Sequence, residues 1–237
     1  MVDPMPVLKA DISGKRLREL AEAGLNVFCR QGFERSQMAD VAKAMGVAVG
    51  TVYLYVESKE ALFDLVVRHS SAGDSAWLDS LEIPVATPAP GTTTAYLREV
   101  FERTEWPCLA AALSKKRVKD PAAELAGVLR EQYHLIRQHR RGLLLLMRSA
   151  LEFPGLAEVF VLGLREKLLD HLARYIALRA KSGQLRAPGD LRATAALAVQ
   201  AITWANLQRP LDPGLAALDE ETIESSTIEL LVHSLLP

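Results

Sequence analysis

The strongest constraint on the fold is that apolar residues recur at helical spacing along almost the whole chain. The first such stretch carries Leu17, Leu20, Ala21 and Phe28 on one face and ends near Gly32. A helix repeats its face about every 3.6 residues, whereas a strand alternates every two. No run of the sequence alternates in that way. We therefore predict an all-α fold with about nine or ten helices.

Size, charge and cysteine content narrow the class of protein. The chain has 237 residues, 49% of them hydrophobic, so it can bury a sizeable core. Its net charge of −1 argues against a protein that coats nucleic acid nonspecifically, so any DNA contact must be local. Cys29 and Cys108 each fall within apolar helical pattern. That placement favours free thiols over a disulfide framework, and two cysteines alone make no zinc site.

The sequence contains no candidate membrane span or export signal. The longest apolar run, residues 142–147, is far shorter than the roughly 20 residues that cross a bilayer. Residues 1–10 carry two prolines and two opposite charges, and they lack the basic flank and apolar stretch of a secretory signal. We expect a cytoplasmic protein without membrane contact, with a flexible arm at residues 1–12.

Two short helical segments follow the first helix, at residues 37–44 and 49–55, with a turn at Gly46 between them. Each is too short to be stable alone in water, so packing must hold it in place. Ser58 is placed to cap the next predicted helix, over residues 59–77.

The helical pattern breaks at residues 82–94, where three prolines and several threonines predict a surface loop. Asp120-Pro121 is a favourable helix opening, because aspartate caps and proline suits the first helical position. Beyond the loop we predict helices over residues 96–115, 121–137, 140–153, 155–182, 191–207 and 219–235.

Residues 40–62, DVAKAMGVAVGTVYLYVESKEAL, have the pattern of a helix-turn-helix. Ala42 is small enough for two helices to cross closely, Gly46 permits positive φ, and Val47 fills the corner between them. A second helix held in this way enters a major groove about 12 Å wide and meets the base edges there. The candidate DNA-binding residues are Gln37, Ala48, Val49, Gly50, Thr51, Tyr53, Tyr55 and Lys59.

These candidates have different expected roles. Gly50 lets the helix approach DNA closely, and Thr51 has a hydroxyl that can hydrogen-bond a base or a phosphate. The hydroxyls of Tyr53 and Tyr55 reach phosphates, and Lys59 adds a positive charge at the start of the next helix. An exposed Gly-Thr and Tyr-x-Tyr serve no purpose in a core, which favours DNA binding over a merely compact helical corner.

Residues 13–67 resemble the TetR family of bacterial transcriptional regulators, which share the glycine turn, the Gly-Thr-x-Tyr segment and the Ser-Lys-Glu-x-Leu segment. The resemblance implies a helix-turn-helix DNA-binding domain at residues 13–58. It also implies a helical effector-binding and dimerisation domain at residues 59–237, whose last two helices pair across a two-fold axis. Such a homodimer represses by binding double-stranded operator DNA and leaves it when a small molecule binds.

Four positions depart from the family pattern. Gln37 stands where a threonine cap is usual, so Ser36 is an alternative cap for the second helix. Ala48 lacks the usual hydroxyl, Val49 stands at an often basic position, and Val56 replaces a phenylalanine. Sequence specificity then depends more on thymine methyl groups and on Thr51 than on an arginine reading guanine.

The C-terminal half contains candidates for an effector site and for a dimer interface. Arg148 and Glu152 are four residues apart on one helix, so we expect them to form an ion pair. Ordinary core packing or solvation is the alternative for every candidate in both sets. The ligand candidates are Trp106, Tyr133, His134, Arg137, Met147, Arg148 and Glu152. The dimer candidates are Ala195, Ala198, Ile202, Trp204, Ile228 and Leu231.

Two other classes of protein compete with a regulator. A helical-bundle enzyme would use Glu131 and His134, which have the Glu-x-x-His spacing of di-iron proteins, but the partner motif is absent from the sequence. Cys108 has no local activating group, so we expect no catalytic residue, metal or cofactor. The second alternative is a helical protein-interaction module whose DNA binding has degenerated, which the departures at Ala48 and Val49 keep open.

Overall fold

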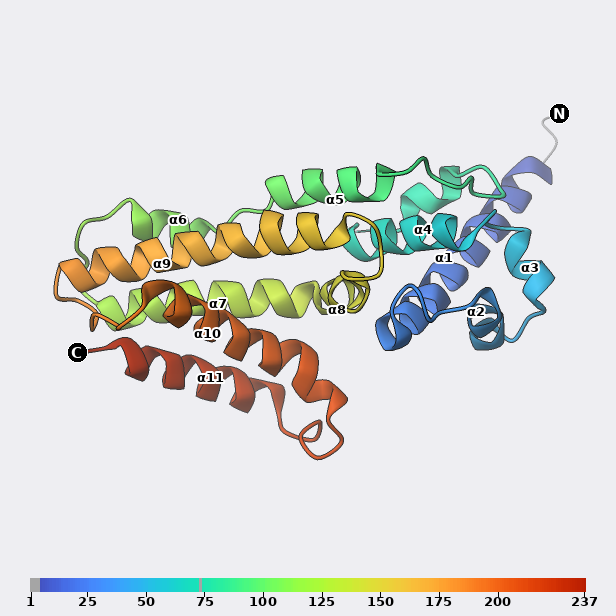
Figure 1. Cartoon of the computed structure of the whole chain (residues 1–237). Coiled ribbons are helices and arrows are strands. Elements are labelled where there is room, and N and C mark those ends of the chain that lie inside the picture. Colours follow the sequence, from blue (N-terminus) through green and yellow to red (C-terminus); the bar gives the residue numbers. More distant parts are fainter. Residues whose placement is uncertain (1–4, 73) are drawn as a thin grey trace. The chain divides into compact units, whose positions relative to one another are not determined.

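A computed structural model describes residues 5–72 and 74–237, with side chains from residue 14 onward (Figure 1). The described residues form helices joined by loops, and their one β-type pairing is an isolated bridge between Val56 and Val85. The predicted all-α fold is confirmed.

The elements follow one another in the order of Figure 1. In the first half they are α1 (Met5–Gln31), α2 (Met38–Met45), α3 (Val49–Tyr53), α4 (Lys59–Ser71), a 3-10 helix η1 (Ala76–Ser80), α5 (Thr92–Glu102) and α6 (Pro107–Leu113). In the second half they are α7 (Pro121–Gln138), α8 (Arg140–Ser149), a π-helix η2 (Glu158–Arg165), α9 (Glu166–Lys181), α10 (Leu191–Thr203), a π-helix η3 (Trp204–Gln208), a 3-10 turn η4 (Arg209–Leu211) and α11 (Glu220–Leu235).

Some predicted boundaries need correction. The helix predicted over residues 96–115 is two helices, because Pro107 has no N–H to continue α5 and instead begins α6. The helix predicted to end at Trp77 ends at Ser71. Residues 5–12 of the predicted flexible arm belong to α1, and residues 1–4 lie outside the described residues.

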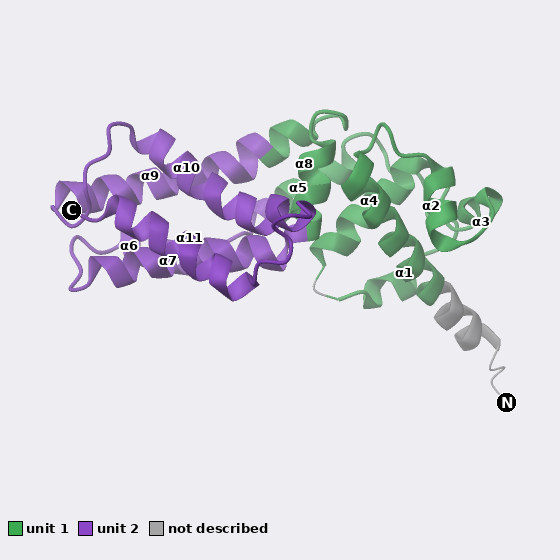
Figure 2. Cartoon of the chain, turned by 90° about the horizontal axis from the view of Figure 1, so that it is seen from below, with its two compact units in different colours: residues 1–100, 141–160 green, residues 101–140, 161–237 purple. Residues whose placement is uncertain are grey.

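The chain divides into two compact units, shown in green and purple in Figure 2. The first comprises residues 1–100 and 141–160, and the second comprises residues 101–140 and 161–237. The first unit is therefore built from two stretches of chain that are 40 residues apart in the sequence, and it extends beyond the segment 13–58 predicted to bind DNA.

The first unit is organised around α1, which packs against α2, α4 and η1. Its core contains a cluster of four phenylalanines. The Phe63 ring packs edge-on to Phe28 at 5.3 Å between centroids and to Phe33 at 5.0 Å, and it stacks on Phe153 at 4.6 Å. Phe153 lies just beyond α8, so this cluster fixes the second stretch of chain to the first.

The second unit is a helical bundle in which α9 packs on α10, α7 packs on α11, and α6 contacts both α7 and α9. Its core is made of leucine, isoleucine, valine and alanine side chains together with Trp106, Tyr133 and Tyr175. Helices of 7 to 18 residues, such as α6 and α7, are marginally stable alone in water, so burial of their apolar faces in this core stabilises them.

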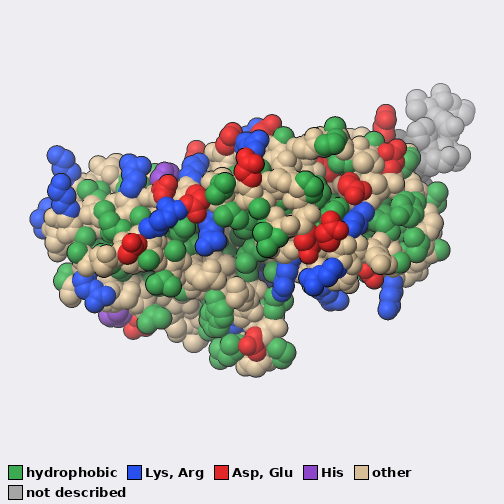
Figure 3. Space-filling model, viewed as in Figure 1, with side chains coloured by type: hydrophobic (Ala, Val, Ile, Leu, Met, Phe, Trp, Pro, Cys, Tyr) green, Lys and Arg blue, Asp and Glu red, His purple; other side chains and the backbone are tan. Residues whose placement is uncertain are grey.

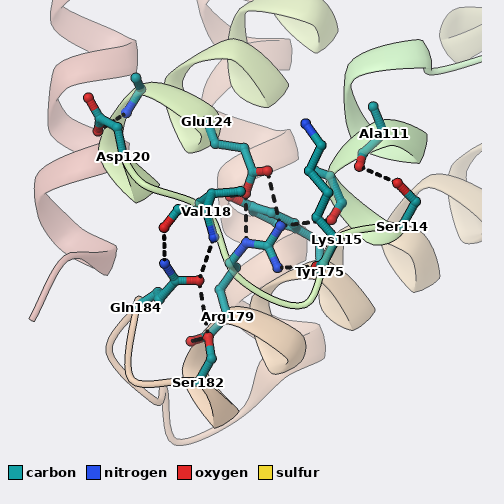
Figure 4. Close-up of polar contacts among 12 residues, drawn as sticks. Ala111, Ser114, Lys115, Val118, Asp120, Glu124, Tyr175, Arg179, Ser182 and Gln184 are labelled. Carbon is teal, nitrogen blue, oxygen red and sulfur yellow. Dashed lines mark hydrogen bonds and ion pairs between the residues drawn. The ribbon is translucent and has the colours of Figure 1, made fainter.

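A fully buried arginine ties three helices of this bundle together, as Figure 4 shows. Arg179 on α9 donates to both carboxylate oxygens of Glu124 on α7, at 2.6 and 3.0 Å. It also donates to the carbonyls of Ala112 in α6 and Lys115, both at 2.8 Å. Burial and the Glu124 carboxylate raise the pKa of Tyr175, whose hydroxyl also donates to Glu124. The charge of Arg179 is thus fully compensated.

On the face drawn in Figure 3, Lys and Arg side chains are interspersed with Asp and Glu side chains. This mixture agrees with the net charge of −1. Within residues 5–72 and 74–237, no helix is both long enough and apolar enough to span a bilayer.

Candidate nucleic-acid interface

Helices α2 and α3 form the two arms of the predicted helix-turn-helix. Gln37 is the N-cap of α2, and its backbone N–H donates to the Asp40 carboxylate at 2.9 Å. Gly46 ends α2 with φ of 68°, a left-handed conformation that glycine adopts without strain. The Val47 N–H then donates to the Ala42 carbonyl at 3.0 Å, which closes the turn before α3 begins.

One face of α3 is exposed while the other packs on the unit. Val52 is buried, whereas Val49, Gly50 and Tyr53 are exposed, the last with 46% of its surface accessible. A Cβ placed on Gly50 would meet no atom within 4 Å. Among residues whose side chains are described, none therefore covers α3 at the positions predicted to approach DNA.

The polar groups of this segment are also available. Gln37 and Ala48 are exposed, and Thr51 and Tyr55 are half-buried. The hydroxyls of Thr51, Tyr53 and Tyr55 have no hydrogen-bond partner among the described residues. The N-cap residue Ala48 makes no side-chain cap, as expected for an alanine that replaces serine or threonine.

Lys59 and Ser36 have structural roles that the sequence did not indicate. The Lys59 ammonium donates to the Phe33 carbonyl at 3.0 Å and lies 4.3 Å from the centroid of the Phe33 ring. It also approaches the carbonyls of Glu34 and Ser36, at 3.3 and 3.4 Å. The hydroxyl of Ser36 donates to the Gly32 carbonyl at 2.6 Å, so Ser36 does not cap α2, whose N-cap position is occupied by Gln37.

Residues 141–160 are bonded to α1, the helix on which α2 of the helix-turn-helix packs. Arg141, at the start of α8, donates to the Glu22 carboxylate of α1 at 2.8 Å. Partial burial raises the pKa of Glu22, but hydrogen bonds from Arg141 and His69 outweigh that effect and bring the net pKa below its ordinary value. This link between distant parts of the sequence could not be read from local periodicity.

The expected ion pair between Arg148 and Glu152 is not formed. Arg148 is exposed, and the Glu152 carboxylate instead accepts from the backbone N–H of Glu34 at 3.1 Å. Gly32 leaves room for that carboxylate, since a Cβ there would lie 2.5 Å from its Oε2 atom. Glu152 thus fixes the loop between α1 and α2, because a backbone N–H that needs a partner outcompetes an exposed side-chain pair.

The ligand candidates fall in different places. Met147, Arg148 and Glu152 belong to the first unit, while the other four belong to the second. Trp106 and Tyr133 are buried in the core of the second unit. His134 and Arg137 are exposed, and they line a surface cleft of about 510 Å³ with Gln138, Arg140 and Glu220.

Charges in this cleft are paired with one another. His134 contacts Glu224 at 2.8 Å, and Arg137 lies 3.4 Å from the same carboxylate. Arg140 reaches Glu220 at 3.2 Å. These contacts join α7 and the first residue of α8 to the first turns of α11, so the predicted ligand candidates on α7, His134 and Arg137, hold helices together.

Most of the dimer candidates lie in the core of their own unit, which corrects the predicted contact face. Ala195, Ala198, Ile202 and Ile228 are buried there, so intramolecular packing accounts for them. Leu231 is half-buried and Trp204 is exposed. The outward faces of α10 and α11 instead carry Leu197, with 71% of its surface accessible, and Leu230, with 68%.

Residues that an enzyme would use have other partners. The carboxylate of Glu131 accepts from the backbone N–H groups of Cys108 at 2.6 Å and Leu109 at 3.1 Å, at the start of α6. Partial desolvation of this exposed residue and the Glu131 carboxylate both raise the pKa of the Cys108 thiol, which disfavours the nucleophilic thiolate. Across the described part of the chain, no group of three or more His, Cys, Asp or Glu side chains is arranged to hold a metal ion.

Comparison with known proteins adds to these observations. Residues 20–66 match the family described as bacterial regulatory proteins, tetR family. The HTH-type transcriptional regulator LuxR of Vibrio harveyi is 33% identical over 95 residues, which are 39% of this chain and 46% of LuxR. The chain thus matches less than half the length of that relative.

Two solved structures share the fold over nearly the full length. The ketosteroid transcriptional regulator KstR2 of Mycobacterium tuberculosis has a TM-score of 0.57 at 14% identity, covering 94% of this chain and 95% of that one. AibR in complex with isovaleryl coenzyme A and operator DNA has a TM-score of 0.53 at 17% identity, covering 92% and 98%. Residues 20–66 thus match the tetR-family segment that contains the helix-turn-helix, and the chain as a whole shares its fold with these two solved structures.

Proposed function

We propose that the protein is a ligand-responsive transcriptional repressor that binds operator DNA through α3 and leaves it when a small molecule binds the C-terminal helices. The observation that carries this proposal is the open face of α3, with Val49, Gly50 and Tyr53 exposed. A helix held at its N-terminal end by a tight turn and open on one face has the geometry that enters a major groove.

The proposed partners are double-stranded DNA, a small molecule and a second copy of the chain, all in the cytoplasm. A two-fold dimer places two recognition helices about 34–36 Å apart, one turn of DNA. Leu197 and Leu230 support this assembly, because large leucine side chains this exposed are stabilised when a partner covers them. We propose residues 13–58 as the DNA-reading part and residues 59–237 as the part that binds the effector and dimerises.

Release from DNA needs no chemistry. A ligand that binds more tightly to a state unable to contact both half-sites shifts the population toward that state. A difference of a few kcal/mol in affinity is sufficient to empty the operator. AibR has been solved with both isovaleryl coenzyme A and operator DNA, which illustrates the two binding functions on this fold. We propose no enzymatic activity.

The test is a selection of duplexes from a random-sequence pool by the purified full-length protein. We expect enrichment of one palindromic sequence, with the bound fraction measured by fluorescence anisotropy. Tyr53→Ala should weaken binding to that duplex about tenfold, and Tyr53→Phe should separate the contribution of the hydroxyl from that of the ring. Enrichment of no sequence, or binding unchanged in Tyr53→Ala, contradicts the proposal.

One observation favours a second candidate function. Leu54, just beyond α3, has 66% of its surface exposed, and Val49 is exposed where family members often carry a basic residue. An apolar α3 surface is also suited to a protein partner. Two results together would identify an interaction module. The protein would select no DNA sequence, and it would form a stable complex with another protein that Leu54→Asp abolishes.

A further inference from the structure

A strap, residues 81–91, runs from η1 to α5 and pairs with the chain directly after α3. The backbone N–H of Val85 donates to the Tyr55 carbonyl at 2.8 Å, and the Val85 carbonyl accepts from the Glu57 N–H at 3.0 Å. These two bonds form the parallel bridge between Val56 and Val85. The segment predicted only as a surface loop is therefore bonded to the corner between α3 and α4.

Side chains reinforce this pairing. The Glu57 carboxylate accepts from the backbone N–H of Thr87 at 2.8 Å. The hydroxyls of Thr87 and Ser58 lie 2.7 Å apart, within hydrogen-bond distance. Ser58 is also the N-cap of α4, because its hydroxyl oxygen accepts from the Ala61 N–H at 3.0 Å. The strap thus contacts the segment between α3 and α4 and the N-cap residue of α4.

The strap is anchored at its far end as well. The hydroxyl of Thr93, in the first turn of α5, donates to Asp64 on α4 at 2.8 Å. Asp64 also pairs with Arg68 at 2.7 Å, and the Arg68 guanidinium lies 4.4 Å from the centroid of the Tyr96 ring on α5. The strap is therefore bonded at its middle to residues 55–58, and the helix that follows it is bonded to α4, so it is not a free tether.

Helix α3 needs such support. It has only five residues, so its own hydrogen bonds do not make it stable, and Ala48 provides no side-chain cap at its start. The turn before α3 fixes one end, and the strap contacts fix the backbone of residues 55–58 at the other. Orientation of the exposed face therefore depends on groups that lie outside α3.

We infer that Glu57 and Thr87 are positioning residues for DNA recognition, which hold α3 at the angle that the major groove requires without being assigned a contact to DNA. This inference rests on the proposed function. It has a distinctive electrostatic consequence. Removing the negative charge of Glu57 near a DNA-binding surface should strengthen binding if charge alone matters, whereas loss of the strap contact should weaken it.

A matched pair of double variants separates these effects. Glu57→Gln with Thr87→Ser removes the charge but keeps an acceptor for the Thr87 N–H and a hydroxyl for Ser58. Glu57→Ala with Thr87→Val removes the charge and both side-chain contacts. We expect the second pair to bind the selected duplex about tenfold more weakly than the first, from the loss of two hydrogen bonds. Hydrogen exchange of the amides in residues 54–58 should be faster in the second pair only.

Equal binding and equal amide exchange in the two pairs would overturn the inference. A lower melting temperature with unchanged discrimination between selected and random duplexes would also overturn it, because a merely structural contact affects folding and not recognition. Different results would contradict the proposed function itself: the unmodified protein selects no DNA sequence, or Tyr53→Ala binds the duplex as tightly as the wild type.

Discussion

The rings of Phe153 and Phe63 stack with 4.6 Å between their centroids and 25° between their planes. Phe63 belongs to α4, whereas Phe153 follows α8, some 90 residues later in the sequence. Phe153 also packs edge-on to Phe33 at 5.0 Å. The core behind the helix-turn-helix is thus completed by a residue from the C-terminal half of the chain.

Phe153→Ala should therefore destabilise the first unit by about 2–3 kcal/mol, from lost burial and two lost aromatic pairs. Phe153→Leu keeps most of the apolar volume and should cost about 1 kcal/mol. Urea unfolding followed by circular dichroism measures both variants. If Phe153→Ala has the same free energy of unfolding as the wild type, the phenylalanine cluster does not hold residues 141–160 in place.

Two glycines allow folding and DNA binding to be tested apart. A Cβ on Gly50 meets nothing within 4 Å, so Gly50→Leu should fold with an unchanged melting temperature but bind the selected duplex poorly. A Cβ on Gly24 would lie 2.9 Å from Val66 of α4, so Gly24→Ala should lower the melting temperature. Equal DNA affinity in Gly50→Leu and wild type would remove α3 from the interface.

The buried pair of Arg179 and Glu124 should be sensitive to loss of either partner. Arg179→Met leaves the Glu124 carboxylate without its counter-charge, with only the Tyr175 hydroxyl as a donor, and two carbonyls without their donor, and should cost about 3–5 kcal/mol. Arg179→Lys should recover little, because a single ammonium does not reproduce the planar, bidentate geometry. Differential scanning calorimetry checks both, with Arg179→Met plus Glu124→Leu as the control that should be less destabilised than Arg179→Met alone.

The exposed leucines of α10 and α11 predict how the chain associates. Leu197→Asp with Leu230→Asp should yield a monomer with an unchanged circular dichroism spectrum, because neither side chain contributes to the core of its own unit. Ala198→Asp, which places a charge inside that core, should instead unfold the unit. Sedimentation equilibrium distinguishes the outcomes, and a dimer that persists in the double variant would place the interface elsewhere.

The two thiols should differ in reactivity. Burial raises the pKa of Cys29 from its ordinary value of 9.0 to about 11, even though the nearby Arg141 lowers it in part. At pH 8 only about one Cys29 thiol in a thousand is then ionised. Iodoacetamide should modify the exposed Cys108 first, as site-resolved mass spectrometry would show. Faster labelling of Cys29 would contradict its burial.

The same shift has a consequence for stability. Because the pKa of Cys29 is raised in the folded state, the stabilisation it gives is complete below about pH 9 and is lost as pH rises toward 11. The difference in unfolding free energy between wild type and Cys29→Ala should therefore be constant up to pH 9 and change above it.

Local sequence signals predicted much of the fold. The glycine turn at Gly46, the Ser58 cap and the Asp120-Pro121 opening lie where the sequence indicated, because caps and turns depend on residues within a few positions of one another. The open face of α3 follows from the same local pattern.

What the sequence did not indicate depends on contacts between distant residues. The alanines of α10 suggested close helix packing, but a stripe of small residues does not reveal whether the partner is intramolecular, as it is for Ala195 and Ala198. Glu152 was expected to pair with Arg148, yet it meets the Glu34 N–H more than 100 residues away. The strap bonds of Val85 and Thr87 are likewise invisible to helical periodicity.

The return of residues 141–160 to the first unit limits how this protein can be recombined with others. A chimaera joined at residue 58 would transplant Phe33 without Phe63 or Phe153 and would graft Glu34 onto a scaffold that lacks Glu152. Exchange of DNA specificity between relatives by gene fusion therefore requires transfer of both stretches of the first unit, with crossovers after residues 100, 140 and 160, or a host whose own helices already supply the missing aromatic rings.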